Sequence, residues 1–482
     1  MNWILAALLC GVLVETMMRL PLGAALGSLR AHSMKALRVM QAAGVSDHWK
    51  EKAIGAYSRA TFMATLRIAL MLGLVLAIAL GLTLLFDLVS AGFADFLLGW
   101  TGLIFTLVAA LGWYLLRRRP GRGRGDAAAA YGPLDRLLHR LALGVPALAE
   151  LSFDMDQSRV KRDGAEVRQA PHVFVSGLAR AGTTILMRRI HASGEFRSLT
   201  YRDMPFVLAP NLWGRVSAMS KTEAKAAERA HGDNIAVDVD SPESFDEAFW
   251  RVFDGESYIA RDHLAPHAPD DETRDRFADY VTAILASGDG ATRYLSKNNN
   301  NVLRLGALRA TFPRAALLVP FRDPAAQARS LMRQHANFFD QQSDDGFTRA
   351  YMGWLGHHEF GGDHRPFRFD AAGAARLAAG DPKGDAYWLE LWTQVYGWLE
   401  RSAPEDAIFV CYEDLCADPQ VWAALALRLG LDPDAASEGE NFAAAPAREV
   451  EGLDPAALAA ARAIWTRLRA RGRADLGLAA PD

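Results

Sequence analysis

Two apolar segments without any charged residue constrain the fold of this chain more than any other feature. They cover about residues 68–86 and 96–116, and only Asp87–Asp95 separates them. Each has roughly the 20 residues that a helix needs to cross ~30 Å of hydrocarbon. We therefore expect a hairpin of two membrane-spanning helices, and a pair of buried core helices is the alternative.

The basic residues around these segments predict their orientation. Arginines follow the second segment and basic residues precede the first, whereas the turn carries only acids (Arg117, Arg118, Arg119, Arg122, Arg124; Lys50, Lys52, Arg59, Arg67). Basic residues concentrate on the cytoplasmic side of membrane proteins. We therefore predict a multi-pass protein of the cell inner (plasma) membrane, with everything after residue 116 in the cytoplasm.

The N-terminus has a third apolar stretch, about residues 3–20, which Glu15 and Arg19 interrupt. No basic region precedes it, so a cleaved signal peptide is not expected. It is either a further span, entered with the N-terminus outside, or a helix that lies in the membrane interface. Basic residues after it place its C-terminal side in the cytoplasm in both cases.

Composition changes along the chain and suggests three parts. Residues 1–119 form the membrane region, and residues 120–164 form a linker followed by a juxtamembrane helix. Glycine, arginine and alanine dominate 120–130, as in a flexible linker. Helical apolar spacing follows at 134–151, in a segment that lies against the membrane or packs on the globular domain. Residues 165–482 read as that domain, ending in helices.

Charge and cysteine content exclude some classes of function. The formal net charge is −3 and there are three cysteines, Cys10, Cys411 and Cys416. The charge gives no reason to expect nucleic acid as a partner. The odd cysteine count, without framework spacing, speaks against a disulfide scaffold and suits a reducing compartment.

A glycine-containing loop follows an apolar stretch at 171–175, which we expect to be a buried strand. The loop, Ser176–Thr184, has glycines at 177 and 182, and a helix is expected to start near Thr183. A strand, a turn with glycines and a helix N-terminus together point backbone N–H groups at one anion. Thr183 stands where nucleoside triphosphate-binding loops of this spacing carry a lysine, so a shorter 5′ phosphate chain is expected.

A second arginine–serine pair follows another apolar strand, residues 316–319. Arg322 comes at the end of that strand, and Pro324 suits the first turn of a helix that carries Ser330. An arginine at the end of a strand and a serine on the next helix can converge on one phosphate. The alternative is that Arg322 pairs with a carboxylate and Ser330 is exposed.

These motifs resemble those of the sulfotransferases that use 3′-phosphoadenosine 5′-phosphosulfate (PAPS). Ser176–Thr184 resembles the 5′-phosphosulfate loop of that family, S-G-x-P-R-S-G-T-T, with Ala179 in place of proline and Ala181 in place of serine. Arg322–Ser330 resembles the element that holds the 3′-phosphate, and Tyr412–Leu415 resembles a late Y-E-D-L. The likeness covers the globular domain alone.

The resemblance implies a fold, a co-substrate and a binding site. The fold is α/β: a P-loop-like three-layer domain with a parallel sheet, here preceded by an N-terminal helical membrane region. The co-substrate is PAPS, and no metal is expected. The residues implied in binding are Gly177, Arg180, Ala181, Gly182, Thr183, Thr184, Arg322 and Ser330.

Two further residues are predicted to act in catalysis. Lys297 ends a predicted strand, is similar to the strand-ending lysine of many family members, and is expected to stabilise charge on the bridging oxygen. Asp203 lies after the first helix, where some relatives have an acidic base; the alternative is that it pairs with Arg202. Glu195 and His335 are the substitutes for the base.

Residues 335–369, rich in histidine and aromatic residues, are expected to form a lid or acceptor-binding loop rather than a metal site.

The function predicted is therefore a membrane-anchored sulfotransferase that moves a sulfuryl group from PAPS to a hydroxyl or amine of a carbohydrate or lipid-linked acceptor. One alternative is a metal-dependent membrane glycosyltransferase that uses Asp238 and Asp240. Another is a P-loop nucleotide-dependent enzyme. A third is a non-catalytic membrane adaptor with a vestigial loop. The partners expected are the lipid bilayer and the acceptor.

Overall fold

The computed structural model describes the following residues: 2–21, 47–99, 101–102, 105–106, 109–110, 113, 133–160, 163–218, 227–228, 236–237, 245–288, 290–344, 346–433, 441–443 and 452–480. Contacts divide the chain into two compact units, Met1–Arg122 and Gly123–Asp482. Each unit has apolar residues of its own at its centre.

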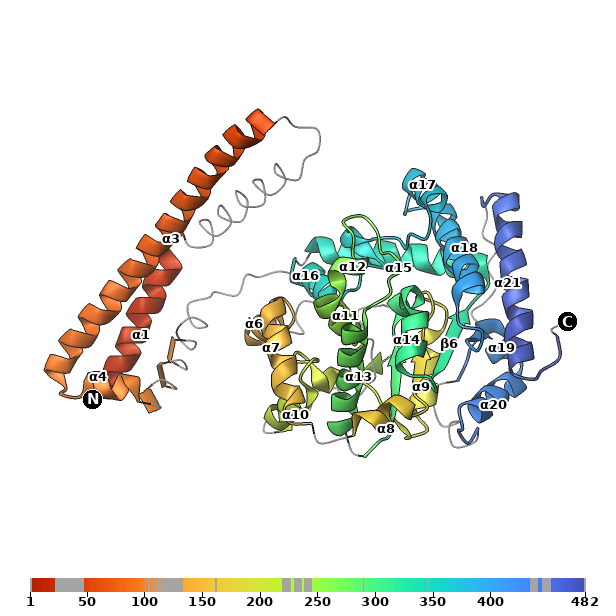
Figure 1. Ribbon diagram of the computed structural model, residues 1–482, viewed down its shortest axis with the longest axis horizontal. Coiled ribbons are helices and arrows are strands. Elements are labelled where there is room, and N and C mark those ends of the chain that lie inside the picture. The colour runs from red at the N-terminus through yellow and green to blue at the C-terminus, as the bar shows by residue number, and fades with distance from the viewer. Residues whose placement is uncertain are drawn as a thin grey trace. The chain divides into compact units, whose positions relative to one another are not determined.

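The first unit is helical. It contains α1 (Asn2–Arg19), α3 (Asp47–Val89) and α4 (Phe93–Leu98) (Figure 1). Leu5 and Leu9 of α1 pack with Phe93 in a small apolar cluster. Asn2 Oδ1 accepts a hydrogen bond of 2.6 Å from Ser90 Oγ. The N-terminus of α1 therefore lies at the turn that follows α3.

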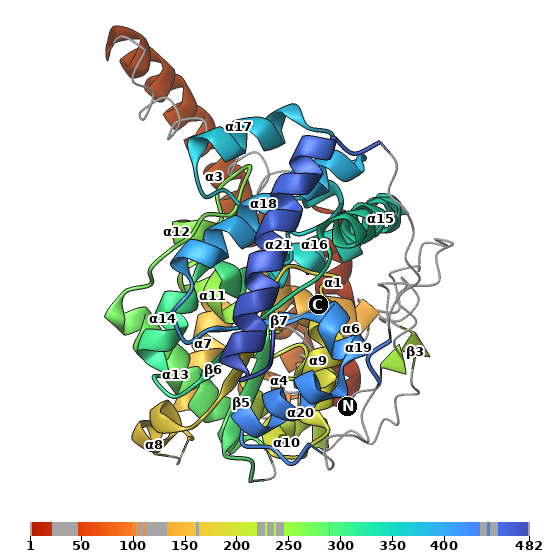
Figure 2. The same cartoon turned by 90° about the vertical axis from the view of Figure 1, so that its right-hand side faces the viewer.

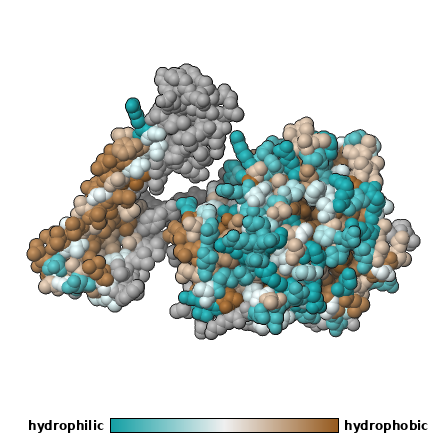
Figure 3. Space-filling view, viewed as in Figure 1, coloured by the Kyte–Doolittle hydropathy of each residue, from teal (hydrophilic) through white to brown (hydrophobic). Residues whose placement is uncertain are grey.

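Two helices of this unit are long and apolar enough to cross a membrane. They are α1 and the Ser58–Val89 part of α3, with mean hydropathy of 1.4 and 2.7 over their most apolar windows. No residue in the α3 window is buried, and Figure 3 shows hydrophobic surface along the helix. The predicted segment 68–86 lies inside α3. Ten of the 21 residues of the predicted segment 96–116, and the linker up to residue 132, fall outside the described residues.

The second unit is built on a parallel sheet of five strands in the order β2-β5-β1-β6-β7. The strands are β1 (Val173–Val175), β2 (Phe196–Arg197), β5 (Arg293–Lys297), β6 (Ala316–Phe321) and β7 (Ile408–Cys411). A separate short antiparallel pair joins β3 (Ala227–Glu228) to β4 (Ala236–Val237). Because β1 is central, the loop after it has a neighbouring strand on both sides.

Helices surround this sheet (Figure 1). The α-helices are α6 (Pro133–Ala142), α7 (Pro146–Gln157), α8 (Gly164–Gln169), α9 (Thr183–His191), α10 (Pro210–Ala218), α11 (Glu247–Phe253), α12 (Gly255–Tyr258), α13 (Asp271–Ala286), α14 (Leu305–Thr311), α15 (Pro324–Asp344), α16 (Gly346–Trp354), α17 (Ala371–Ala379), α18 (Asp385–Ser402), α19 (Tyr412–Ala417), α20 (Pro419–Arg428) and α21 (Pro455–Asp475). The 3₁₀ helices are η2 (Tyr201–Asp203), η3 (Asn299–Leu303) and η4 (Gly361–Asp363).

Side chains alternate between the two faces of the sheet, as they must along a strand. Phe174 of β1 joins the larger apolar core with residues of α13, α15 and α18. Val173 and Val175 join a second core with residues of α9 and α20. Both faces are therefore covered, and the predicted α/β fold with a parallel sheet and flanking helices is confirmed.

The C-terminal helix α21 lies along β7, the edge strand (Figure 2). Gly472 permits the close approach, since a Cβ atom at this position would collide with the Phe409 carbonyl. The helix begins with Pro455 after Asp454, whose side chain accepts hydrogen bonds from backbone N–H groups of the first turn.

Candidate active site

The predicted site residues follow the carboxyl ends of neighbouring strands. Lys297 ends β5, the loop Ser176–Thr184 (the glycine loop) follows β1, and Arg322 follows β6. Val175 pairs in register with Lys297 on one side and with Leu318 on the other. In open parallel sheets, ligands bind at this edge.

The glycine loop has little room for side chains at its two glycines. A Cβ atom at Gly177 would collide with the Pro320 carbonyl oxygen. At Gly182, φ is +81° and a Cβ atom would collide with the Tyr412 ring. Arg180 adopts φ = 67°, the only positive φ of a non-glycine residue in the described part of the chain. The loop then enters α9, whose first residue, Thr183, is buried. The glycine loop therefore leads from the end of β1 to the N-terminus of α9, and the free backbone N–H groups at a helix N-terminus can bind an anion.

The second motif lies directly beside the glycine loop. Arg180 Nε donates a hydrogen bond of 3.1 Å to Ser330 Oγ, at the end of the second turn of α15. Gln327, one turn earlier on α15, donates from Nε2 to the Ala179 carbonyl at 3.0 Å. The structure therefore brings together two motifs that lie 150 residues apart in the sequence.

Arg322 is held at the entrance to α15. Its guanidinium lies 5.6 Å from the centre of the Tyr412 ring, and its Nε is 3.6 Å from Glu413 Oε1. Burial is the main cause that raises the pKa of Tyr412, to about 12, so the phenol stays neutral. Within the described part of the chain, Arg322 Nε is buried and has no hydrogen-bond partner. A bound anion would supply that partner.

Lys297 is buried at the end of β5, with 8% of its surface exposed. The next residue, Asn298, donates its backbone N–H to the Val175 carbonyl at 3.0 Å. Lys297 therefore lies beside the residue that precedes the glycine loop. Lysine is rarely this buried unless it serves a structural or chemical purpose.

Comparison with known proteins identifies the domain that contains this site. Residues 171–360, which include the glycine loop, Lys297 and the Arg322–Ser330 pair, match the model of a sulfotransferase family. The chain carries a sulfotransferase family domain. It is accordingly an enzyme of the class that transfers sulfuryl groups, as predicted from the motifs.

Solved structures of bacterial sulfotransferases are also similar. Sulfotransferase STF1 of Mycobacterium tuberculosis has 17% identity and a TM-score of 0.37, over 67% of this chain and 83% of that one. Sulfotransferase STF9 of Mycobacterium avium has 16% identity and a TM-score of 0.31, over 74% and 81%. A sulfotransferase of Alicyclobacillus acidocaldarius has 15% identity and a TM-score of 0.28, over 64% and 97%. No curated protein matches the chain.

Asp203 has structural contacts in the sulfotransferase domain. Its Oδ2 accepts from the backbone N–H of Thr200 at 2.7 Å and from the Thr200 hydroxyl at 3.2 Å, in a capping box. Its Oδ1 accepts from Arg197 at 2.7 Å. These contacts favour the alternative role for Asp203, which was an ion pair. The partner is Arg197 rather than the Arg202 that was expected. The catalytic role stays a prediction.

The substitutes for the base are also engaged. Glu195 pairs with Arg293 at 2.9 Å. His335 accepts from the Gly361 backbone N–H at 3.3 Å, and its ring lies against Trp388 and His364. Burial lowers the pKa of His335, so the ring is neutral.

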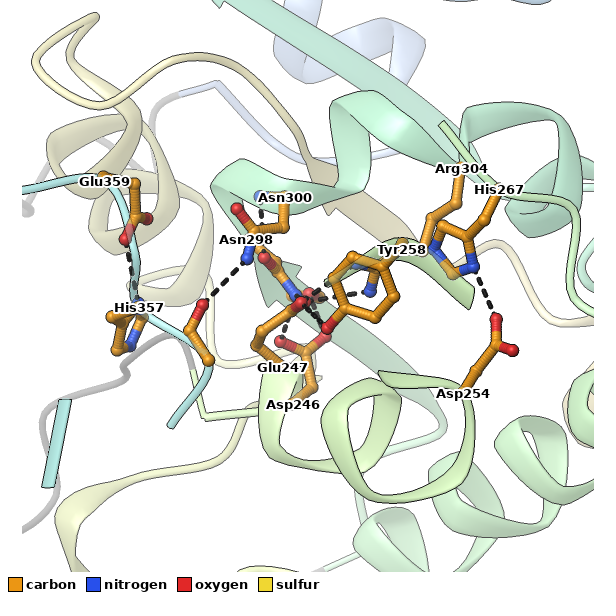
Figure 4. Close-up of polar contacts among 12 residues, drawn as sticks. Asp246, Glu247, Asp254, Tyr258, His267, Asn298, Asn300, Arg304, His357 and Glu359 are labelled. Atoms are coloured by element: carbon orange, nitrogen blue, oxygen red, sulfur yellow. Dashed lines mark hydrogen bonds and ion pairs between the residues drawn. The ribbon is translucent and has the colours of Figure 1, made fainter. Parts of the chain in front are cut away.

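Glu359 is an acidic residue that sequence reasoning did not select. It lines a cavity together with Leu178 and Ala179 of the glycine loop. Glu359 Oε1 accepts from Asn299 Nδ2 at 3.1 Å. Glu359 Oε2 lies 3.5 Å from His357 Nδ1 (Figure 4). Burial alone would raise the pKa of Glu359. The charge of His357 and the hydrogen bonds from His357 and Asn299 have a larger opposite effect, and they hold the pKa at about 2. The site therefore contains a fixed carboxylate near the glycine loop.

The same cavity has a mainly apolar wall. Its remaining lining residues are Leu331, Phe360, His364, Arg365, Pro366, Phe367, Trp388 and Leu391. Burial is the main cause that lowers the pKa of His364, to about 4, so this ring is neutral as well. The segment predicted to be a lid or acceptor loop thus forms one side of the cavity.

A buried polar network supports the segment after Lys297, and its members lie too far apart in the sequence for a spacing rule to link them. Asn298 Nδ2 donates to Glu247 Oε2 at 2.7 Å and to Asp246 Oδ1 at 3.2 Å (Figure 4). Arg304 binds both oxygens of Glu247, at 2.9 and 3.0 Å, and neither side chain is exposed. Burial raises the pKa of Asp246 to about 6. This network fixes the backbone that carries Lys297.

Metal binding has no support among the described residues, where no group of three or more His, Cys, Asp or Glu side chains is placed to hold an ion. Asp238 and Asp240, the acids of the glycosyltransferase alternative, lie outside the described residues.

Proposed function

We propose that this sulfotransferase takes its sulfuryl group from PAPS. The observation that carries the proposal is the hydrogen bond between Arg180 and Ser330, which joins the glycine loop to the Arg322–Ser330 motif. Two anion-binding elements side by side suit a nucleotide with one phosphate group at the 5′ position and another at the 3′ position.

The residues present fit such a donor. The collisions at Gly177 and Gly182 show that the loop packs closely against Pro320 and Tyr412 and has no room for a Cβ atom at either position. The buried Arg322 Nε lacks a hydrogen-bond partner among the described residues. Thr183 has no charge with which to reach a γ-phosphate, which speaks against a nucleoside triphosphate. We assign the 5′ group to Gly177, Arg180, Ala181, Gly182, Thr183 and Thr184, and the 3′ group to Arg322 and Ser330.

The donor supplies an activated sulfuryl group, and the chain supplies positioning and charge. In the reaction, the acceptor oxygen or nitrogen forms a bond to sulfur while the bond between sulfur and the 5′-phosphate oxygen breaks. Lys297 and the backbone N–H groups of the glycine loop stabilise the negative charge that grows on the leaving oxygen. The acceptor's proton passes to a base of the protein.

Glu359 is a better candidate for that base than Asp203. Both carboxylates have partners, but Glu359 lines the cavity beside the glycine loop and Asp203 does not. The Glu359→Gln variant should lose about 10²–10⁴-fold in turnover, and Asp203→Asn should lose stability instead. Sulfur-labelled PAPS turnover with the full chain measures the first effect. Equal turnover of Glu359→Gln and the parent would remove Glu359 from this role.

We further propose that the enzyme is anchored in the cell inner membrane, with its active site in the cytoplasm. The support is the two apolar helices and the basic residues that flank the apolar segments. The position of Asn2 beside Ser90 agrees with an N-terminus and a turn on the same, outer side. An anchored active site suits an acceptor hydroxyl or amine on a carbohydrate or a lipid-linked molecule.

The donor is tested by ligand-dependent thermal shift of the full chain in detergent. We expect stabilisation by adenosine 3′,5′-bisphosphate (PAP), the product of PAPS, and none by UDP-sugars or ATP. Stabilisation by a UDP-sugar with a divalent metal would favour the glycosyltransferase, and stabilisation by ATP alone would favour a P-loop nucleotide enzyme. Binding of PAP without turnover of PAPS in native membranes would favour the non-catalytic adaptor. Label from PAPS found only in soluble products would contradict a membrane acceptor.

A further inference from the structure

The cavity beside the glycine loop has one cationic side chain to which the protein gives no partner. Arg365 is half-buried and lines this cavity together with Glu359 and a set of mainly apolar residues. Among the residues that the structure describes, its guanidinium makes no hydrogen bond and no ion pair. A guanidinium has five N–H donors and keeps its charge at physiological pH. This group can therefore serve an anionic ligand.

The carboxylates of the same segment are engaged with other cations. Asp363 accepts hydrogen bonds from Arg349 Nε at 2.8 Å and from Arg349 Nη2 at 2.6 Å. These bonds are the main cause that lowers the pKa of Asp363, and the charge of Arg365 has only a minor effect on it. Glu359 has His357 at 3.5 Å. Each acid thus has a cation of its own, and neither neutralises Arg365.

The backbone that carries Arg365 is held on both sides. Its own N–H donates to the His358 carbonyl at 2.9 Å. The Pro366 carbonyl accepts from the Leu264 N–H at 2.9 Å, and the Arg368 N–H donates to the Leu264 carbonyl at 2.8 Å. The cavity wall is almost entirely apolar, so the stem of Arg365 forms part of the wall and its charged head lies at the rim. The position of the residue is fixed, while its head is left to a ligand.

We propose that Arg365 recognises an anionic group, a carboxylate or a phosphate, on an acceptor whose apolar part lies against the cavity wall. The proposal rests on the function proposed above and narrows its acceptors to negatively charged ones. Arginine binds either oxyanion through paired hydrogen bonds, and aromatic residues of the wall, Phe360 and Trp388, offer surface to the apolar part. The hydroxyl or amine of such an acceptor can then lie towards Glu359 and the glycine loop, which line the same cavity.

The experiment measures how three matched probes bind to the full chain in detergent, saturated with PAP. The probes are 4-hydroxyphenylacetate, its neutral amide and tyramine, which share a phenol ring and differ in charge. Arg365→Met keeps an apolar stem, and Arg365→Lys keeps the charge. Arg368→Met is the control, at an exposed arginine that does not line the cavity. Saturation-transfer NMR titrations give the affinities, and the thermal midpoint reports whether each variant is folded.

We expect the parent to bind the acid about tenfold more tightly than the amide, as a charge-assisted hydrogen bond implies, and to bind tyramine most weakly. Arg365→Met should lose this preference for the acid. Arg365→Lys should keep part of it, and Arg368→Met should keep all of it. The affinity for PAP should be the same in every variant.

Equal binding of the acid and the amide by the parent would overturn the proposal, and so would binding of none of the probes. Both results come from the parent alone and do not depend on the folding of a variant. Weaker binding of PAP by a folded Arg365→Met would also overturn it, because Arg365 would then serve the donor. A parent that does not bind PAP would instead refute the proposed donor, which separates the two questions.

Discussion

Arg180 Nε and Ser330 Oγ form a hydrogen bond of 3.1 Å between the glycine loop and α15. The arginine belongs to the predicted 5′ site and the serine to the predicted 3′ site, so the two sites share a contact in the free protein. A nucleotide bound at either predicted site would therefore contact a side chain that is hydrogen-bonded to the other site. The following predictions concern this site and the framework that supports it.

The Arg322→Ala variant should bind PAP about 10–100-fold more weakly, because a charge-assisted hydrogen bond contributes about 1.5–3 kcal/mol. AMP, which has no 3′-phosphate, should bind the variant and the parent equally well. Isothermal titration calorimetry with both nucleotides measures the difference. Arg376→Ala, which removes an exposed arginine paired with Glu390, is the control and should change neither affinity. Equal losses for PAP and AMP would contradict the assignment to the 3′-phosphate.

The Lys297→Ala variant should turn over PAPS about 10²–10³-fold more slowly, since it lacks a charge that acts on the leaving oxygen. Its affinity for PAP should stay within a few-fold of the parent. Turnover is measured with sulfur-labelled PAPS, and Lys383→Ala, at an exposed lysine, should behave like the parent. Normal turnover of the Lys297 variant would show that another group stabilises the charge.

The Gly182→Ala variant should lower the thermal midpoint by several degrees and lose its stabilisation by PAP. The added methyl group meets the Tyr412 ring at a positive φ, which costs about 1–3 kcal/mol. Gly214→Ala is the matched control, because a Cβ atom there meets nothing within 4 Å and alanine favours the helix. A Gly182 variant that is as stable as the parent and binds PAP would show that the loop adapts.

The Glu247→Gln variant should destabilise the sulfotransferase domain by about 3–5 kcal/mol, since it leaves the Arg304 charge buried without its partner. Chemical denaturation followed by tryptophan fluorescence measures this loss, because Trp250 lies under the Arg304 guanidinium. Glu272→Gln removes one partner of an exposed pair on α13 and should change stability by less than about 0.5 kcal/mol. Similar losses of unfolding free energy in both variants would show that the buried Glu247–Arg304 pair contributes no more to stability than the exposed pair.

Stability should decline as the pH falls from about 6.5 to 4. Burial is the main cause that lowers the pKa of His358 and of His364 to about 4 in the folded state. The unfolded chain binds these protons at about 6.5, so acid favours unfolding over that interval. His364→Asn should flatten the decline of the thermal midpoint with pH. A parent whose midpoint is constant over this interval would contradict the prediction.

The strands and the glycine loop were predictable because their signals are local. The apolar runs before Ser176 and Arg322 define β1 and β6, and Pro324 marks the start of α15. The parallel sheet then brings the loop and Arg322 to one edge. No contact between distant residues had to be known for this part of the fold.

The support behind Lys297 was not predictable in the same way. Asp246 and Glu247 are buried against Asn298 and Arg304, about 50 positions away in the sequence, and no spacing rule links them. Asp203 is a different case, since Thr200 three residues before it is the signature of a capping box and favoured a structural role. Glu359 was visible only as one acid in a histidine-rich run, and the fold alone places it in the same cavity as Leu178 and Ala179 of the glycine loop.

The backbone of Arg180 carries a consequence for how this position can change. At φ = 67° the backbone conformation costs less energy for glycine than for arginine. Glycine, however, has no side chain that could reach Ser330 or an anion. Substitutions that relieve the backbone strain at this position are therefore expected to weaken the proposed binding of the donor. Selection for thermal stability would favour glycine at position 180, whereas selection for catalysis would favour arginine.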